Sequence, residues 1–75
     1  MRNTSDMTTH ELVSTAVQAA EGTNLLLFQD CLSGLQRKPQ EDLLQGISSI
    51  MILLGLKGIN GSFKGGAEQI FNTLQ

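Results

Sequence analysis

The chain has 75 residues, with five basic and seven acidic side chains and a net charge of −2. A chain of this length forms one domain at most, so residues 1–75 are expected to be a single domain with a modest core. The basic residues do not cluster along the sequence, which argues against a nucleic-acid-binding protein. Three phenylalanines and no tryptophan or tyrosine make the expected core aliphatic.

The first part of the chain is expected to be a flexible leader over 1–7, followed by a helical segment over 8–36. Thr8 and Glu11 match a capping box, in which each side chain satisfies a backbone N–H at the start of a helix. The segment Glu21–Asn24 interrupts the helical pattern with a poor helix former, Gly22, and two capping residues, Thr23 and Asn24. The sequence leaves open one kinked helix or two helices with a short break.

A turn is predicted at 37–39, followed by a second helix over 39–56. Arg37 and Lys38 place positive charge at the negative end of the preceding helix. Pro39 disfavours helical geometry at the residue before it and suits the first position of a new helix. Acidic side chains follow directly, where the helix dipole favours them.

The second helix is unusually apolar, because Leu43–Leu56 contains no charged residue. Five positions form an apolar stripe at helical spacing, and two more widen it beyond the side that one partner helix covers. This excess indicates a third helix or another subunit. The stripe is Leu43, Ile47, Ile50, Met51 and Leu54, and the widening residues are Ile52 and Leu53.

Glycine recurs at every third position from the end of this run onward. If the helix continues, Gly55, Gly58 and Gly61 form a smooth surface for close approach of another backbone. The helix penalty of glycine favours the alternative, a Gly-rich loop over 57–66. A short C-terminal helix is then expected over 67–75.

The expected fold is therefore all-α: a small helical hairpin, with a kinked first helix and a short third C-terminal helix as additional features. The predicted assembly interface combines the excess apolar face with the glycines and the last helix. Its residues are Leu43, Ile47, Ile50, Met51, Ile52, Leu53, Leu54, Gly55, Gly58, Gly61, Ile70 and Phe71.

No residue pattern predicts an enzyme, a metal site, a cofactor site or a small-molecule substrate. His10 is the single histidine and lies at an expected helix start, where it is a solvated polar residue rather than a base with partners. Cys31 is the single cysteine and lies in an apolar run, which predicts a small buried side chain. The 14 uncharged residues of Leu43–Leu56 fall short of the ~20 that span a bilayer, so a membrane partner is not expected.

The second half of the chain resembles the needle and inner-rod subunits of type III secretion systems. The run Pro39–Gln45 is similar to the start of the long C-terminal helix of that family, Lys64 falls near a lysine of the family, and Ile70–Gln75 is similar to its end. The resemblance covers about half of the chain. It implies a non-enzymatic helical subunit that self-assembles, in a secretion apparatus or outside the cell.

Two functions follow as hypotheses. The first is a self-assembling structural subunit whose partner is another copy of the chain. The alternative is a small cytoplasmic adaptor, chaperone or inhibitor that acts as a dimer or on another small helical protein.

Overall fold

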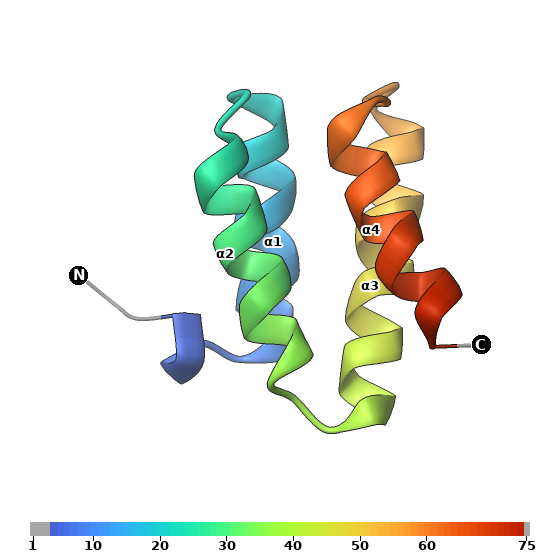
Figure 1. Cartoon of the computed structure of the whole chain (residues 1–75). Helices are drawn as coiled ribbons and strands as arrows, with labels where there is room; N and C mark the ends of the chain where they lie inside the picture. The colour runs from blue at the N-terminus through green and yellow to red at the C-terminus, as the bar shows by residue number, and fades with distance from the viewer. Residues whose placement is uncertain (1–3, 75) are drawn as a thin grey trace.

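The computed structural model describes residues 4–74, and within this range the chain forms four α-helices (Figure 1). The all-α class is confirmed, and the four helices form two successive helical hairpins. The elements are a short 3-10 turn at Thr4–Asp6, α1 at Thr9–Glu21, α2 at Leu25–Gln36, α3 at Gln40–Leu56 and α4 at Ser62–Thr73.

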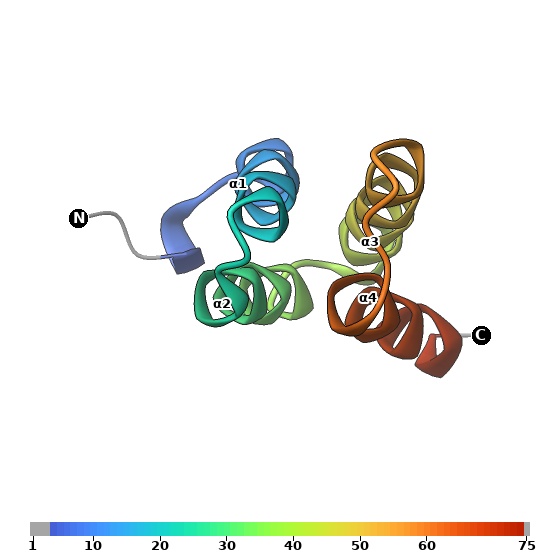
Figure 2. The same cartoon turned by 90° about the horizontal axis from the view of Figure 1, so that it is seen from above.

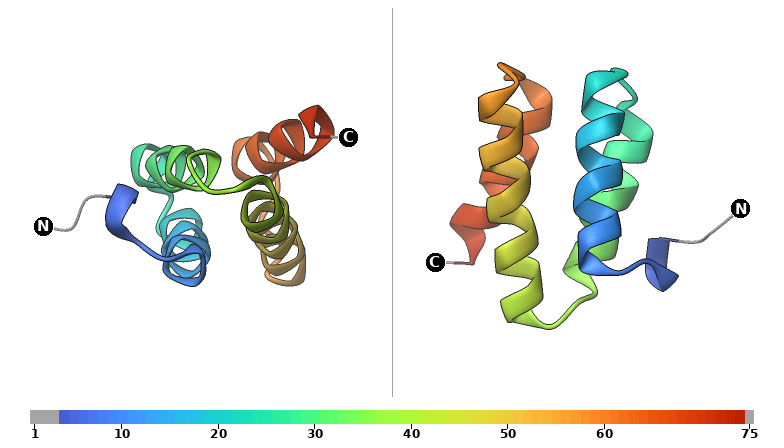
Figure 3. Two further views of the ribbon diagram at one scale, coloured as in Figure 1. Left: turned by 90° about the horizontal axis from the view of Figure 1, so that it is seen from below. Right: turned by 180° about the vertical axis from the view of Figure 1, so that it is seen from behind.

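The two hairpins lie side by side, so the helices form two layers. Seen from above, α1 and α3 occupy one layer and α2 and α4 the other (Figure 2). The connection from α2 to α3 joins the hairpins at one end of the molecule (Figure 3). α1 packs closely on α2 and α3, whereas α2 and α4 make fewer contacts with each other. The layer formed by α2 and α4 is therefore the open side of the fold.

The core lies between these layers and is almost entirely aliphatic, as the composition predicts. Its side chains come from all four helices, and their removal from water is the main stabilising term. Phe28 is the largest of them, and its ring meets that of Phe63 edge-on at a centroid distance of 5.2 Å. The other fully buried side chains include Leu12, Leu35, Ile47, Ile50 and Leu54.

The first helical segment is two helices, which resolves the alternative that the sequence left open. α1 ends with Gly22 as its C-cap, and Thr23 adopts a left-handed conformation with φ of 54°. Asn24 then begins α2, because its side chain accepts a hydrogen bond from the Leu27 N–H at 3.1 Å. This reversal folds α2 back onto α1.

The predicted capping box at the start of α1 is present. The Glu11 N–H donates to Thr8 Oγ1 at 3.1 Å, and the Thr8 N–H donates to Glu11 Oε1 at 2.9 Å. The two side chains thus satisfy two backbone donors that the helix itself leaves without partners.

The flexible leader predicted over 1–7 is wrong for its described part, while residues 1–3 lie outside the described residues. Thr4–Asp6 forms a 3-10 turn, and Met7 packs partly buried against the core. Gly34 explains why this turn docks on α2. A Cβ at Gly34 would lie 3.0 Å from Leu12 Cδ2 and 3.2 Å from the Thr4 carbonyl oxygen. Gly34 is thus a close-packing residue inside α2 rather than the helix breaker its type suggests.

The predicted turn at 37–39 is confirmed. The helix that follows it begins at Gln40, one residue later than the predicted residue 39. Arg37 is the C-cap of α2. Pro39 has ψ of 151°, so it is the N-cap of α3 rather than its first helical residue. Glu41 and Asp42 lie in the first turn of α3, as predicted.

The Gly-rich loop is shorter than the predicted 57–66, and the last helix begins before the predicted 67. Gly58 and Gly61 have φ of 71° and 74°, which ends α3 and separates it from α4. Gly65 and Gly66 nevertheless lie inside α4. Their helix penalty of about 1 kcal/mol each is offset by the packing of α4 side chains such as Ala67 and Ile70 on the core.

Alanine substitutions at two of these glycines are expected to have opposite effects. Gly65→Ala should stabilise the protein by about 1 kcal/mol, because no atom lies within 4 Å of the added Cβ and alanine favours the helix. Gly58→Ala should destabilise it by about 1–2 kcal/mol, because an L-residue is strained at φ of 71°. Urea unfolding followed by circular dichroism measures both, and a stabilising Gly58→Ala would contradict the loop.

Candidate functional site

The predicted interface residues on α3 do not share one face. Four of them form the inner face of the helix and are buried in the core of the chain itself: Leu43, Ile47, Ile50 and Leu54. They are therefore not available to a second copy, because α1, α2 and α4 already cover them. A two-helix hairpin would have left part of this stripe open, but the fold has four helices.

The remaining predicted residues divide between the edges and the surface. Four pack partly buried against the core: Met51, Leu53, Ile70 and Phe71. Gly55 is exposed near the Lys64 ammonium group, whereas Gly58 and Gly61 lie in the loop. The helical glycine surface considered as one alternative is thus wrong, because the backbone leaves the helix at Gly58. Ile52 is the one predicted large side chain that is mostly exposed, at 62%.

An uncharged ridge runs along α3, and its lower part, Gln45 and Ser49, borders a hollow against α1. At about 100° per residue, Ile52 and Leu56 point away from the core stripe, and Gln45 and Ser49 lie on the same line. We call these four residues the α3 ridge. Leu56 is 79% exposed, so the upper half of the ridge offers two large apolar side chains to solvent.

The α3 ridge ends at a salt bridge. Lys57 Nζ lies 3.1 Å from Glu21 Oε2, with both side chains nearly half exposed. Exposed pairs of this kind contribute about 0–1 kcal/mol, so this one adds little stability. Its position marks where the uncharged surface of α3 stops.

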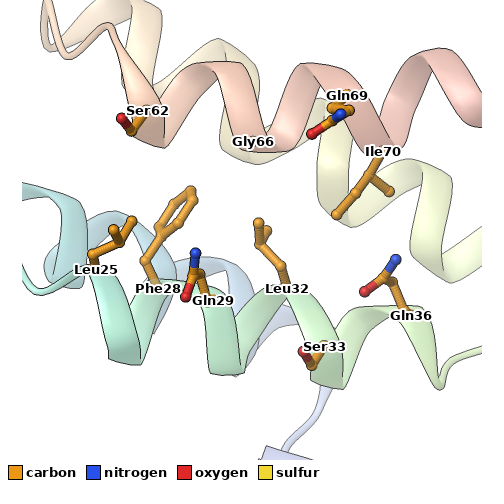
Figure 4. A pocket seen from close by; sticks show the side chains of 10 residues that line it. All are labelled: Leu25, Phe28, Gln29, Leu32, Ser33, Gln36, Ser62, Gly66, Gln69 and Ile70. Carbon is orange, nitrogen blue, oxygen red and sulfur yellow. The ribbon is translucent and has the colours of Figure 1, made fainter.

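A groove separates α2 from α4 on the open side of the fold (Figure 4). Its upper part has a volume of about 310 Å³, and a lower part of about 380 Å³ shares Gln36, Gln69 and Ile70 with it. We call this continuous surface the α2–α4 groove. Most of its lining comes from two helices: Leu25, Phe28, Gln29, Leu32, Ser33 and Gln36 from α2, and Ser62, Gly66, Gln69, Ile70 and Thr73 from α4.

Two residues of α4 shape the groove. Phe63 rests against Phe28 and holds the first turn of α4 near α2. Gly66 has no side chain, and a Cβ there would meet Leu32 Cδ1 at 3.8 Å and Phe28 Cε2 at 3.9 Å. The floor of the groove is thus apolar, and the amides and hydroxyls along its edges carry no charge.

The amino-acid sequence does not predict the groove. Gln29 and Gln36 are exposed polar residues of α2, and nothing in the pattern indicates that α4 comes to lie beside them. The pattern of α2 carries no signal for it, because Gln29 and Gln36 are polar and a spacing of four and three residues is common to every face of an α-helix.

The side chains that could bind a metal ion or take part in catalysis lie apart from one another in the described residues. No group of three metal-ligating side chains occurs within residues 4–74, and His10 is exposed on the first turn of α1. Cys31 is fully buried, as predicted, and burial followed by the charge of Asp30 raises the pKa of its thiol above the usual value. A thiol in this position stays protonated and shielded from reagents.

Two further findings concern the chain as a whole. In the part that the structure describes, none of the helices combines the length and the apolar character needed to cross a membrane. Comparison with protein-family models, with curated proteins and with solved structures finds no match to this chain.

Proposed function

We propose that this protein is a non-enzymatic helical subunit that assembles with copies of itself. The observation that supports this proposal is the α3 ridge, where Ile52 and Leu56 remain 62% and 79% exposed after the chain has formed its own core. Two large apolar side chains exposed on one helix face form a surface that a partner chain can bury. Burial of each against a partner stabilises an assembly by about 1.5–3 kcal/mol.

The resemblance to secretion needle and inner-rod subunits gives this proposal a biological setting. In that setting the assembly is a filament or rod of a secretion apparatus. The run Pro39–Gln45 that carries the resemblance forms the start of α3, the helix that also bears the ridge.

The proposal is tested by charged substitutions on the ridge. Ile52→Asp and Leu56→Asp are each expected to weaken self-association by at least about 2 kcal/mol, because a carboxylate would have to be buried at the contact. Sedimentation velocity measures the mass distribution of each variant beside the wild-type protein.

The matched control is Leu26→Asp on the first turn of α2. Leu26 is 78% exposed but belongs neither to the α3 ridge nor to the α2–α4 groove, so this variant should associate like the wild-type protein. Equal association of all three variants would contradict a role for the ridge.

A second candidate function is an adaptor that binds a helix of a different protein. The α2–α4 groove favours this candidate, since the apolar face of an amphipathic helix can bind in a groove with an apolar floor. A wild-type protein that stays monomeric at all concentrations would favour the adaptor over the self-assembling subunit.

A further inference from the structure

We infer that α4 is a hinged lid, a helix that leaves its place on α2 and α3 as a unit while the other three helices stay folded. In the open state α4 no longer covers the apolar side of α2. The inference concerns the attachment of α4 and does not depend on the proposed self-assembly. Three observations support it: the burial of α4, the start of α4 and the loop that precedes it.

The first observation is how little of α4 is buried. Within Ser62–Thr73, all of which the structure describes, Ala67 is the one buried residue, whereas α1, α2 and α3 bury at least five residues each. Phe63, Ile70 and Phe71 pack against the core but are only partly buried. Burial of an apolar face is the main term that holds a short helix in place. α4 is therefore held less firmly than the other three helices.

The second observation is that the start of α4 lacks the features that stabilise the other helices. α1 and α2 each begin with a side chain that accepts a hydrogen bond from the backbone, and α3 has two acidic residues in its first turn. Gly61, the N-cap of α4, has no such side chain, and the first turn of α4 carries Lys64, whose charge opposes the helix dipole. Gly65 and Gly66 lower the helix propensity further. The helical form of α4 therefore depends on docking.

The third observation is the loop between α3 and α4, residues 57–61. Gly58 and Gly61 have φ of 71° and 74°, a backbone region that glycine enters without steric cost. A Cβ placed on either residue would meet nothing within 4 Å, so the surroundings leave room for the backbone to turn. Hinges are typically a few loop residues that absorb large changes in φ and ψ. These two glycines provide a hinge at the N-terminal end of α4.

The surface of α2 beneath α4 is apolar. The ring of Phe63 meets that of Phe28 at a centroid distance of 5.2 Å, and Gly66 lies beside Phe28 and Leu32 (Figure 4). Phe28 and Leu32 are 1% and 6% exposed, whereas Leu25, one turn earlier on α2, is 42% exposed. Opening of α4 joins these three side chains of α2 into one exposed apolar stripe. The lid thus controls how much apolar surface the protein presents to solvent.

A matched pair of cysteine variants tests the lid. Ala16 on α1 and Ala67 on α4 are both fully buried, so Ala16→Cys and Ala67→Cys place a thiol at equally shielded positions on two helices. The rate of reaction with an aromatic disulfide reagent measures how often each position opens to solvent. The thiol introduced at position 67 is expected to react at least roughly 10-fold faster than the thiol at position 16, because undocking of one helix costs less free energy than global unfolding.

Cys31 is the internal control in both variants. It is fully buried on α2 and does not line the α2–α4 groove, so opening of α4 should leave it shielded. Its labelling rate therefore reports global unfolding, and mass spectrometry of the peptides distinguishes it from the introduced thiol. If the added sulfur atom destabilises the whole fold, Cys31 reacts faster in that variant, and the ratio of the two labelling rates corrects for this change.

Hydrogen exchange of the wild-type protein makes the same comparison without a substitution. After correction for intrinsic rates, the Ile70 amide on α4 is expected to exchange at least roughly 10-fold faster than the Val17 amide on α1. Its exchange should also respond less to added urea, since undocking of one helix exposes less surface than global unfolding. Equal protection of the two amides would overturn the lid even if the two thiols differ, because the added sulfur rather than the wild-type fold would then loosen α4.

Discussion

Replacement of Phe28 by alanine is expected to unfold most of the protein in the absence of denaturant. Phe28 is 1% exposed and is the largest fully buried side chain. Loss of a buried phenylalanine costs about 3–5 kcal/mol, which is as much as the whole stability expected of a single-core domain of this size. Far-ultraviolet circular dichroism and urea titration measure the loss of helix.

Leu26→Ala is the control for this substitution on the same helix. Leu26 is 78% exposed, so its truncation should change the free energy of unfolding by less than about 0.5 kcal/mol. A Phe28→Ala variant with the urea midpoint of the control would show that Phe28 is not at the centre of the core.

Two aspartate substitutions on α3, two residues apart, are expected to have opposite outcomes for folding. Ile50 is fully buried, so Ile50→Asp would bury a carboxylate without a partner and should abolish the folded state. Ile52 is 62% exposed, so Ile52→Asp should keep the helical spectrum of the wild-type protein. Circular dichroism of the two purified variants shows which of them keeps its helices.

This comparison tests the orientation of α3 apart from any assembly. If α3 were rotated by about half a turn, Ile52→Asp would unfold the protein and Ile50→Asp would be tolerated. Tolerance of both substitutions would contradict a packed four-helix core.

Local chemistry made part of the fold predictable. The hydrogen bonds of the Thr8–Glu11 capping box, and the backbone restriction that Pro39 places on Lys38, involve only neighbouring residues. The helix boundaries that depend on them agree with the structure to within one residue. The cap at Asn24 was foreseen as one alternative for the same reason.

Tertiary packing decided what the sequence did not predict. Gly34, Gly65 and Gly66 are poor helix formers, yet all three lie inside helices. Gly34 is there because Thr4 and Leu12 approach it closely, a contact that involves residues far apart in the sequence. Helix propensity does not reflect such contacts. The predicted start of the last helix, residue 67, is therefore later than the observed start of α4 at Ser62.

The candidate site was also predictable only in part, because tertiary packing decides which apolar side chains of α3 are buried. The charge-free run Leu43–Leu56 correctly indicated that α3 has more apolar surface than a single partner helix covers. Which side chains form the excess depends on how many helices surround α3. The structure assigns the stripe of Leu43, Ile47, Ile50 and Leu54 to the core and leaves Ile52 and Leu56 outside.

The most direct test of self-assembly is the mass of the wild-type protein in solution across a concentration series. Light scattering coupled to size-exclusion chromatography gives this mass without reference to shape. The account predicts species above the monomer mass of 8.1 kDa that grow with concentration. A constant mass of 8.1 kDa over the whole series would contradict it.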